Sequence, residues 1–321
     1  MARERFTESV VEEAALNWLA GLGYAVVNGP TIAPEEPAAE RASFDEVILA
    51  GRLREALHRL NPGVTAEALD EAFRRVMRVD AADAVGRNRA FHAMLVDGVT
   101  VEQKRKDGSI GGVIVRLVDF DHPDNNDWLA VNQFTVTAGG TNGQNRRPDI
   151  VIFVNGLPLA VVELKNATDE QATIWSAFQQ LQTYKAQIPR LFAYNEALLI
   201  SDGLEARIGT LTADRERFMP WRTTEGEAIA ATTLSQLEVL IKGVFDTRRF
   251  LQLLQHFIVF EDEGAGSVAK KMAGYHQFHA VNQALTETVK ASAATGDRRV
   301  GVVWHTQGSG KSLTMAFYAG R

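Results

Sequence analysis

Hydrophobic residues are densest between residues 149 and 164, where two apolar runs flank the dipeptide Asn155-Gly156. Asn-Gly between two apolar runs is typical of a tight β-hairpin, because both residues tolerate the positive φ angles of its turn. Neither run alternates polar and apolar residues as a half-exposed strand does, so both faces should be buried. The pattern therefore predicts a buried hairpin with strands at Asp149–Val154 and Leu159–Leu164.

Helical and strand-like patterns occur on both sides of this hairpin. Helices are expected at Glu8–Leu22, Phe44–Leu60, Thr65–Arg78, Ala82–Leu95, Thr168–Ile188, Leu234–Leu254 with a break near Gly243, and Tyr275–Ala291. Further strands are expected at Tyr24–Val27, Val99–Lys104, Gly112–Asp119, Ala130–Thr137, Ala197–Ser201, Glu205–Leu211 and Val300–Trp304. The helical stretch between about residues 43 and 96 carries no motif, and we interpret it as an insertion that shapes the surface.

Several boundaries follow from capping, turn and linker signals. Thr7 is a suitable N-cap for the first helix, and Asp202-Gly203 is a suitable turn between two strands. The segment Glu261–Ser267 is charged and rich in glycine, which is typical of a domain boundary. We therefore predict two domains, residues 1–260 and 261–321, and expect limited proteolysis to cut first between Glu261 and Lys271.

Composition narrows the class of protein. The 321 residues are 45% hydrophobic and 23% charged, which is ordinary for a globular protein. No apolar run reaches the roughly 20 residues that span a bilayer, and the N-terminal residues lack the apolar segment of a signal peptide. The sequence contains no Cys, which excludes disulfides and thiolate zinc sites. These features predict a soluble cytoplasmic protein without a membrane partner.

The net charge of −6 indicates that any contact with DNA is local, because phosphate binding requires Lys and Arg. Among the short basic clusters, Arg146-Arg147 is favoured because it adjoins Asp149. The glycine-rich loop before Arg146, residues 139–145, is expected to be mobile enough to meet DNA.

Charged residues on the buried hairpin form the first candidate site. Glu163 and Lys165 lie two residues apart and therefore on one face of their strand, and the hairpin brings Asp149 near them. Two carboxylates and an ammonium can bind Mg²⁺ and orient one of its waters. A purely structural cluster of these charges at a sheet edge is the alternative, and the charge positions alone leave both open.

A resemblance favours the first interpretation. Arg147-Pro148-Asp149, followed fourteen residues after Asp149 by Glu163-Leu164-Lys165, resembles the PD-(D/E)xK nuclease motif, and the surrounding string is similar to the nuclease domain of type I restriction enzyme R subunits. The resemblance implies an α/β fold with a PD-(D/E)xK nuclease core, a mixed sheet flanked by helices. It also implies that Asp149, Glu163 and the Leu164 carbonyl hold Mg²⁺, while Lys165 positions or activates a water.

The same resemblance implies further residues of the nuclease site. Gln180 and Tyr184 match a Q-x-x-x-Y motif that contacts DNA or supports the metal site. Glu12 matches an acidic residue that the first helix often directs towards the metal, and Glu8 is the second choice. Without the resemblance, Gln180 and Tyr184 are surface residues and Glu12 is a solvated residue at the edge of an apolar stripe.

A second motif lies near residue 310. The apolar segment Val300–Trp304 leads into His305-Thr-Gln-Gly-Ser-Gly-Lys-Ser312, and an apolar helix start follows. A strand, a glycine-rich loop, Lys-Ser and a helix are what a phosphate-binding loop requires. The common pattern has Gly where His305 stands; superfamily 2 helicase-like ATPases relax this position, and the sequence resembles them. The residues expected to bind ATP in this loop are Gly308, Ser309, Gly310, Lys311 and Ser312.

Gln277 resembles the adenine-reading glutamine of such motors, with an exposed helical glutamine as the alternative. The segment therefore looks like the first elements of a RecA-like P-loop domain. No Asp-Glu pair follows the loop to hold Mg²⁺ and position water, so we expect this chain by itself to hydrolyse no ATP.

Together the two motifs predict a Mg²⁺-dependent endonuclease domain of a type I restriction enzyme R subunit, which cleaves double-stranded DNA in an ATP-dependent complex. The family implies modification (methyltransferase) and specificity subunits as partners, since this sequence shows no reader of DNA sequence of its own. The alternative is a non-catalytic DNA-binding or assembly module attached to a translocase ATPase.

Overall fold

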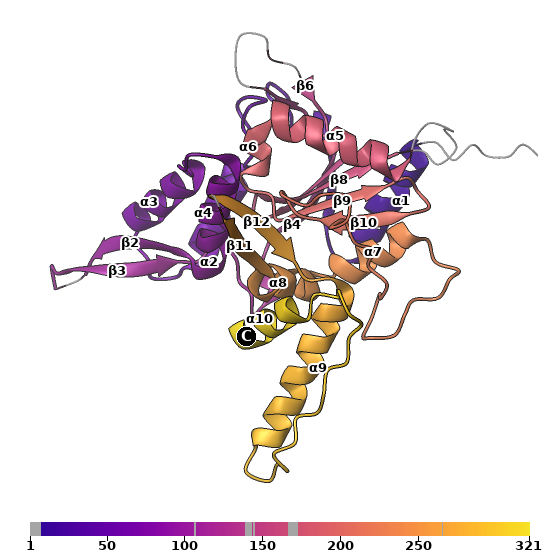
Figure 1. Ribbon diagram of the computed structural model, residues 1–321. Coiled ribbons are helices and arrows are strands. Elements are labelled where there is room, and N and C mark those ends of the chain that lie inside the picture. Colours follow the sequence, from indigo (N-terminus) through magenta and orange to yellow (C-terminus); the bar gives the residue numbers. More distant parts are fainter. Residues whose placement is uncertain (1–7, 106, 139–142, 144, 166–172, 265) are drawn as a thin grey trace, which may run out of the picture.

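A computed structural model describes residues 8–105, 107–138, 143, 145–165, 173–264 and 266–321. Its centre is a six-stranded mixed sheet with the strand order β1-β4-β7-β8-β9-β10 (Figure 1). The strands are β1 (Ala25–Asn28), β4 (Trp128–Asn132), β7 (Ile150–Val154), β8 (Leu157–Leu164), β9 (Ala197–Ser201) and β10 (Ala206–Gly209). The β1–β4 and β8–β9 pairs are parallel and the other pairs are antiparallel, so the predicted mixed α/β fold is confirmed.

The predicted hairpin forms the middle of this sheet. Every residue of β7 and β8 is buried, as the unbroken apolar runs predicted. Asn155 and Gly156 both have positive φ, 53° and 78°, which suits a two-residue hairpin turn. The turn is also crowded, because a Cβ on Gly156 would lie 2.5 Å from the Leu49 carbonyl oxygen. The second strand begins at Leu157, two residues before the predicted start.

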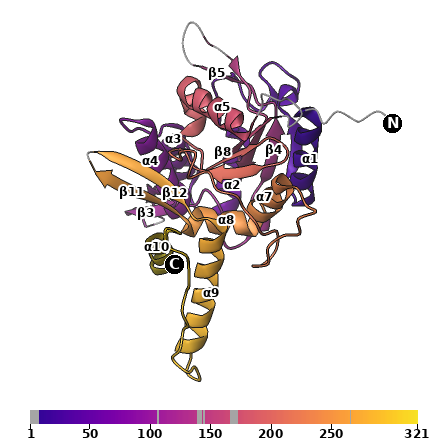
Figure 2. The same ribbon diagram turned by 45° about the vertical axis from the view of Figure 1, so that its right-hand side comes forward.

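Helices cover both faces of the sheet (Figure 2). On one side α1 (Glu8–Gly21) contacts α7 (Gln236–Val244), β1 and β4. On the other side α5 (Ile174–Gln187) contacts β8 and β9, and α6 (Pro189–Phe192) follows it. The central strands are therefore enclosed between two helical layers, which explains why they carry almost no polar residues.

The expected helical insertion is present as α2 (Ala50–Leu60), α3 (Ala66–Met77) and α4 (Ala84–Asp97). Next to it, β2 (Val99–Lys104) and β3 (Ile110–Val115) form a separate antiparallel hairpin that packs on α3. The first helix begins at Ala50 and not at Phe44. Residues before it are held away from helical geometry, because the Leu49 N–H donates to the Gly156 carbonyl at 2.9 Å.

The strand predicted at Ala130–Thr137 is interrupted. It ends as β4 at Asn132, and Gln133 has a positive φ of 55°. A separate short strand, β5 (Val136–Thr137), then pairs with β6 (Asn145–Arg146). The interruption turns the chain away from the main sheet next to Asp149.

The segment at the predicted domain boundary contributes to a hairpin with strands β11 (Ile258–Gly264) and β12 (Ser267–Met272). Its second strand is anchored by Lys270, whose ammonium group is fully buried and lies 2.6 Å from the Glu196 carboxylate. Long-range ion pairing of this kind leaves no local sequence signal, so the hairpin was not predicted. The division into two domains stays a prediction.

The last part of the chain contains α8 (Thr247–His256), α9 (Tyr275–Ser292) and α10 (Lys311–Gly320), with α9 extending away from the sheet and α10 packed against α9 (Figure 1). The predicted break near Gly243 and the predicted helix at Tyr275 are confirmed. The buried strand predicted at Val300–Trp304 is wrong: these residues pair with no strand in the described chain, and Val302 and Trp304 are each 89% exposed. A strand requires a neighbour for its backbone N–H and C=O groups, and the described residues supply none here.

Three other predictions fall wholly or partly outside the described residues. They are the Thr7 cap, most of the loop at residues 139–145, and the first turn of the helix predicted from Thr168. The described helix α5 begins at Ile174, where Thr173 and Ser176 form a capping box. Across the described residues, no helix is long and apolar enough to cross a membrane.

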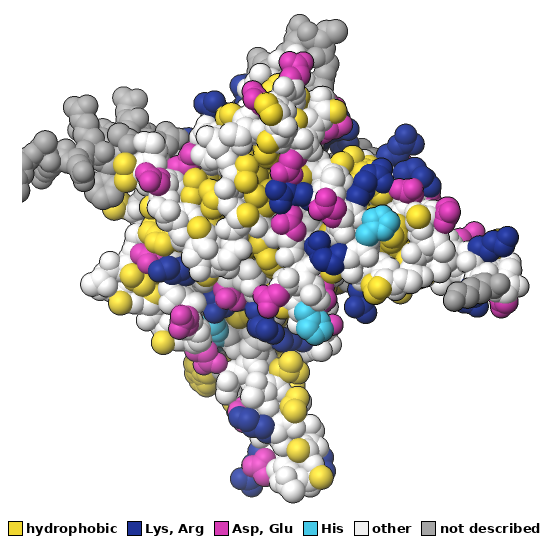
Figure 3. Space-filling model, turned by 180° about the vertical axis from the view of Figure 1, so that it is seen from behind, with side chains coloured by type: hydrophobic (Ala, Val, Ile, Leu, Met, Phe, Trp, Pro, Cys, Tyr) yellow, Lys and Arg dark blue, Asp and Glu magenta, His cyan; other side chains and the backbone are white. Residues whose placement is uncertain are grey.

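Exposed charges of both signs are intermixed on the surface. Figure 3 shows Lys and Arg side chains lying among Asp and Glu side chains on the side opposite to that in Figure 1.

Candidate active site

The β7–β8 hairpin places two acidic side chains opposite each other. Ile150 pairs with Val162, so Asp149 and Glu163 are the next pair along the ladder. Both are nearly inaccessible, with 8% of Asp149 and 2% of Glu163 exposed. The Leu164 N–H donates to Asp149 Oδ2 at 2.6 Å, which fixes the orientation of that carboxylate. A buried strand edge thus carries two carboxylates side by side.

Lys165 completes this group at the end of β8. Its Nζ donates to Glu163 Oε1 at 2.8 Å and to the Leu164 carbonyl at 3.0 Å. Its backbone N–H donates to the Ser201 carbonyl at 2.8 Å, which fixes the end of the strand against β9. The structure therefore brings Asp149, Glu163 and Lys165 together as the hairpin pattern predicted.

Glu12 reaches the same edge from α1. Its carboxylate accepts hydrogen bonds from Asn132 Nδ2 at 2.7 Å and Gln133 Nε2 at 2.5 Å. The Gln133 backbone N–H in turn donates to the Asp149 carbonyl at 2.9 Å, so Glu12 is linked to the site through the end of β4. The sequence analysis did not predict that Asn132 and Gln133 belong to the site. Two amide side chains directly after an apolar strand were a signal that could have indicated it. The side chain of Glu8 lies outside the described part of the protein.

Gln180 and Tyr184 approach the carboxylates from α5. Tyr184 is buried, and its hydroxyl donates to the Arg147 carbonyl at 3.4 Å. Burial raises the pKa of this phenol well above its usual value, and the charges of Glu163 and Asp149 raise it further, while a hydrogen bond with Gln180 acts in the opposite direction. Tyr184 therefore stays protonated at neutral pH and can serve as a hydrogen-bond donor beside the carboxylates.

The donors at this edge suit a hard divalent cation. Asp149, Glu163 and the Leu164 carbonyl offer oxygen ligands, and Mg²⁺ binds through one or two carboxylates while it keeps several waters. The described residues contain no group of three or more His, Cys, Asp and Glu side chains that could hold a metal, so a metal here depends on the two carboxylates and the backbone carbonyl. Lys165 Nζ contacts two of these oxygens, and its positive charge lies where a cation would be attracted.

The glycine-rich loop near residue 310 has the backbone that a phosphate loop requires. Gly308 and Gly310 have positive φ angles of 81° and 77°, and Gly310 is the N-cap of α10. Lys311 Nζ donates back to the carbonyls of Thr306 at 3.0 Å and His305 at 3.4 Å, and Ser312 is exposed. The loop and the helix start are therefore formed, while the strand expected before them is not.

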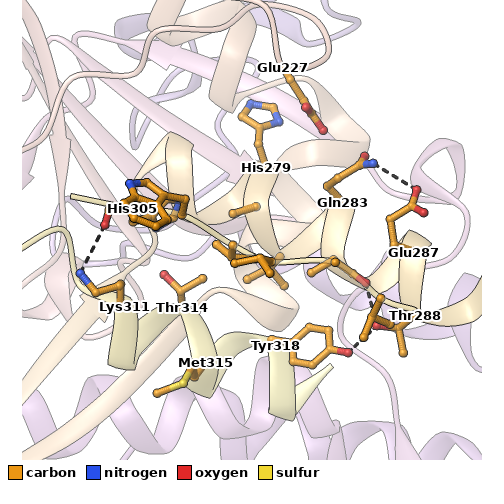
Figure 4. A pocket seen from close by; sticks show the side chains of 18 residues that line it. Glu227, His279, Gln283, Glu287, Thr288, His305, Lys311, Thr314, Met315 and Tyr318 are labelled. Carbon is orange, nitrogen blue, oxygen red and sulfur yellow. Dashed lines mark hydrogen bonds between the residues drawn. The ribbon is translucent and has the colours of Figure 1, made fainter. Parts of the chain in front are cut away.

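An apolar hollow of about 680 Å³ lies between this loop, α9 and α10. Figure 4 shows His279, Gln283 and Thr288 of α9 along one side and Thr314, Met315 and Tyr318 of α10 along the other. The unpaired residues Val300–Trp304 line the same hollow. A strand formed by Val300–Trp304 would cover this apolar hollow.

Gln277 is not an exposed helical residue. Only 4% of it is accessible, its Oε1 accepts from the Gly274 N–H at 2.9 Å, and its Nε2 donates to the Gly310 carbonyl at 3.0 Å. The neighbouring His276 contacts the Ser309 carbonyl at 3.2 Å. Gln277 thus joins the start of α9 to the loop, whereas its expected contact with adenine stays a prediction.

Comparison with known proteins identifies relatives of the region around the β7–β8 hairpin and of the region around the glycine-rich loop. The family model for the N terminus of the type I restriction enzyme R protein matches residues 5–217, and the model for the SWI2/SNF2 ATPase matches residues 276–321. The type I restriction enzyme HindI endonuclease subunit of Haemophilus influenzae is 42% identical over 316 residues, which cover 98% of this chain and 30% of that protein.

A protein of Methanocaldococcus jannaschii, named provisionally as the MjaIXP endonuclease subunit of a type I restriction enzyme, is 35% identical over 329 residues, which cover 97% of this chain and 31% of that protein. The chain thus spans about a third of the length of these relatives.

Proposed function

This chain belongs to the family of type I restriction enzyme R proteins, and on that premise we propose that residues 1–260 form a Mg²⁺-dependent endonuclease domain that cleaves double-stranded DNA. The observation that carries the proposal is the convergence of Asp149, Glu163 and Lys165 at one edge of a buried sheet. Burying charged side chains in two otherwise apolar strands costs free energy, and a bound metal and substrate would offset that cost.

Each residue of this edge has a proposed role. Asp149, Glu163 and the Leu164 carbonyl would hold Mg²⁺, which when bound supplies positive charge to the scissile phosphate and lowers the pKa of a water. The Lys165 ammonium would orient the attacking water, and the protonated Tyr184 hydroxyl would donate a hydrogen bond to a phosphate oxygen. Glu12 would hold Asn132 and Gln133 and thereby position the Asp149 backbone, as the hydrogen bonds between them suggest.

We further propose that residues 261–321 begin a helicase-like ATPase domain. The loop from Gly308 to Ser312 would hold the phosphates of ATP through its N–H groups, with Lys311 on the β and γ groups and the Ser312 hydroxyl on Mg²⁺. Gln277 would couple the adenine base to this loop, since it already bonds the Gly310 carbonyl. The ATP dependence of cleavage, the modification and specificity subunits as partners and a cytoplasmic location belong to the same proposal.

A non-catalytic DNA-binding or assembly module is the second candidate. One observation favours it: Lys165 Nζ already pairs with Glu163, so one of the two carboxylates has a cationic partner without a metal. The two functions differ in whether a metal is needed.

A nicking assay separates them. The assembled complex, with its partner subunits and ATP, is mixed with supercoiled plasmid that carries the recognition site, and Mg²⁺ is titrated from zero. Saturable conversion to nicked and linear DNA that EDTA stops supports the endonuclease. DNA binding without cleavage at any Mg²⁺ concentration supports the second candidate.

A further inference from the structure

A shallow groove runs along the exposed side of α5, next to the site described above. It measures about 550 Å³ and is lined by Thr173, Ser176, Gln179, Gln180 and Thr183, with Arg215 opposite them. Residues 173, 176, 180 and 183 recur at helical spacing, so their side chains share one face of the helix. None of the described residues that line this α5 groove carries a carboxylate, in a chain whose net charge is −6.

Arg215 is held above the groove by aromatic rings and not by an acidic partner. The centre of its guanidinium lies 5.3 Å from the ring centroid of Trp175 and 5.9 Å from that of Phe178. Arg215 is exposed, and it forms no ion pair with a carboxylate in the described part of the chain. Stacking orders the planar group while its N–H donors stay available to a ligand.

The groove leads to the two carboxylates through Gln180. This residue lines the groove and is also hydrogen-bonded to Tyr184, whose phenol lies in the field of Glu163 and Asp149. Gln180 therefore joins the groove to Tyr184, which lies beside the two carboxylates.

A second pair of guanidinium groups lies at the other end of the helix. Arg146 Nε donates to Gln187, the last residue of α5, and Arg147 beside it is exposed. The 14 residues of α5 correspond to about 20 Å at 1.5 Å per residue. Duplex DNA advances 3.4 Å per base pair, so this length corresponds to roughly six base pairs.

Hydroxyl, amide and guanidinium groups contact the phosphates and sugars of DNA without reading its base sequence. We propose that the α5 groove binds the phosphodiester backbone of duplex DNA beside the cleavage site, with Arg215 as its principal cation and Arg146-Arg147 at the opposite end. The inference rests on the proposed nuclease function. It adds to that function the surface along which the DNA lies, which we call the DNA path.

A binding experiment tests the path separately from cleavage. The 321-residue chain is titrated into a fluorescent 20-base-pair duplex in Ca²⁺, which does not support hydrolysis in the assay, and the affinity is measured at several salt concentrations. Arg215→Ala should weaken binding roughly ten-fold, as expected for the loss of one charge-assisted hydrogen bond. It should also reduce the slope of log K against log salt by about one.

Arg248→Ala is the matched control, because Arg248 is an exposed arginine on α8 away from the groove. It should leave both quantities unchanged. Gln179→Glu is a second test that retains the helix and adds a negative charge to the groove, and it should weaken binding at least as much as Arg215→Ala. Thermal unfolding of each variant checks that the fold is intact.

The outcomes separate the two proposals. Equal effects of Arg215→Ala and Arg248→Ala, or no binding of duplex by the unaltered chain, would overturn the DNA path. Loss of cleavage in Asp149→Ala with unchanged duplex affinity concerns the nuclease function alone and leaves the path supported. If Arg215→Ala weakens binding while no form of the enzyme cleaves DNA, the path stands and the nuclease function fails.

Discussion

Two segments of this chain are both rich in apolar residues and have different structures. The second strand of the central hairpin, β8, is buried at every residue and has a partner on each side. Val300–Trp304 is also apolar, yet it is unpaired within the described residues and exposed, with 48% of Val300 and 89% of Trp304 accessible. Apolar sequence thus sets a tendency to form a buried strand, and the neighbours decide whether the strand forms.

The difference also separates two kinds of candidate site. Asp149 and Glu163 are held by a ladder of backbone hydrogen bonds and by packing on both faces. Lys311 and Ser312 lie on an exposed helix start after an unpaired segment. We therefore expect the nuclease edge to be rigid in this chain, and the phosphate loop to depend on residues that Val300–Trp304 can pair with.

The largest expected effect tests whether the two sites are independent. Asp149→Ala, Glu163→Ala and Lys165→Ala should each lower DNA cleavage by the assembled enzyme at least about 1,000-fold, because each removes a proposed metal ligand or the water-positioning ammonium. ATP hydrolysis should stay near its original rate. Parallel measurement of plasmid cleavage and phosphate release checks this, with the exposed Asp124→Ala as a control. Equal loss of both activities would contradict the assignment of two separate sites.

The next effect concerns stability. Val161→Ala in β8 removes two fully buried methyl groups and should lower the free energy of unfolding by about 2 kcal/mol. Val302→Ala makes the same chemical change at a residue that is 89% exposed, and it should change that free energy by less than about 0.5 kcal/mol. Urea unfolding of both variants measures the contrast. Similar losses would show that Val300–Trp304 is packed in solution.

Limited proteolysis tests the predicted domain boundary near residue 260. The hairpin at residues 258–272 is anchored by the buried Lys270–Glu196 pair, so the first cut should move from the sequence-predicted interval to residues 297–304. Cleavage there should be about ten-fold faster than between Glu261 and Lys271, because exposed and unpaired backbone needs no opening step. Mass spectrometry of early fragments after treatment with trypsin and chymotrypsin measures the ratio. First cleavage within the hairpin would instead support the boundary predicted there from the sequence.

The smallest effect is a pH dependence in the packed region. Burial lowers the pKa of Lys185 from 10.5 to about 8. Between these values the unfolded chain binds more protons than the folded one, so this residue makes stability rise with pH in that window. Relative to Lys185→Met, the free energy of unfolding should rise by about 1 kcal/mol from pH 8 to pH 9. Urea unfolding at a series of pH values gives the difference, and a flat difference would show that Lys185 is solvated.

Much of the central region could be predicted because its signals are local. The apolar runs and the Asn155-Gly156 turn predicted the hairpin, and charges inside an apolar strand predicted that Glu163 and Lys165 form a site with Asp149. The placement of Glu12, Gln180 and Tyr184 came only from the family resemblance, since their own environments in the sequence indicated surface residues. In the structure Tyr184 lies beside the carboxylates, Gln180 is bonded to Tyr184, and Glu12 is bonded to Asn132 and Gln133 at the end of β4. The roles of Glu12, Gln180 and Tyr184 stay predictions.

The errors arose where distant contacts decide the structure. The start of α2 depends on the hydrogen bond from Leu49 to the hairpin turn, 107 residues further on. The β11–β12 hairpin depends on the pairing of Lys270 with Glu196, which are 74 residues apart. The failed strand at Val300–Trp304 depends on neighbours that the described chain does not provide. None of these contacts produces a pattern within a short window of sequence.

The central claim is that Asp149, Glu163 and the Leu164 carbonyl form a metal site. Anomalous diffraction from crystals of this chain grown with Mn²⁺, a substitute for Mg²⁺ with a measurable signal, tests it most directly. The account predicts one peak in contact with both carboxylates and the Leu164 oxygen, with the Lys165 ammonium moved away from Glu163 Oε1. A structure at saturating Mn²⁺ that shows no peak at this edge, and Lys165 still bonded to Glu163, would contradict it.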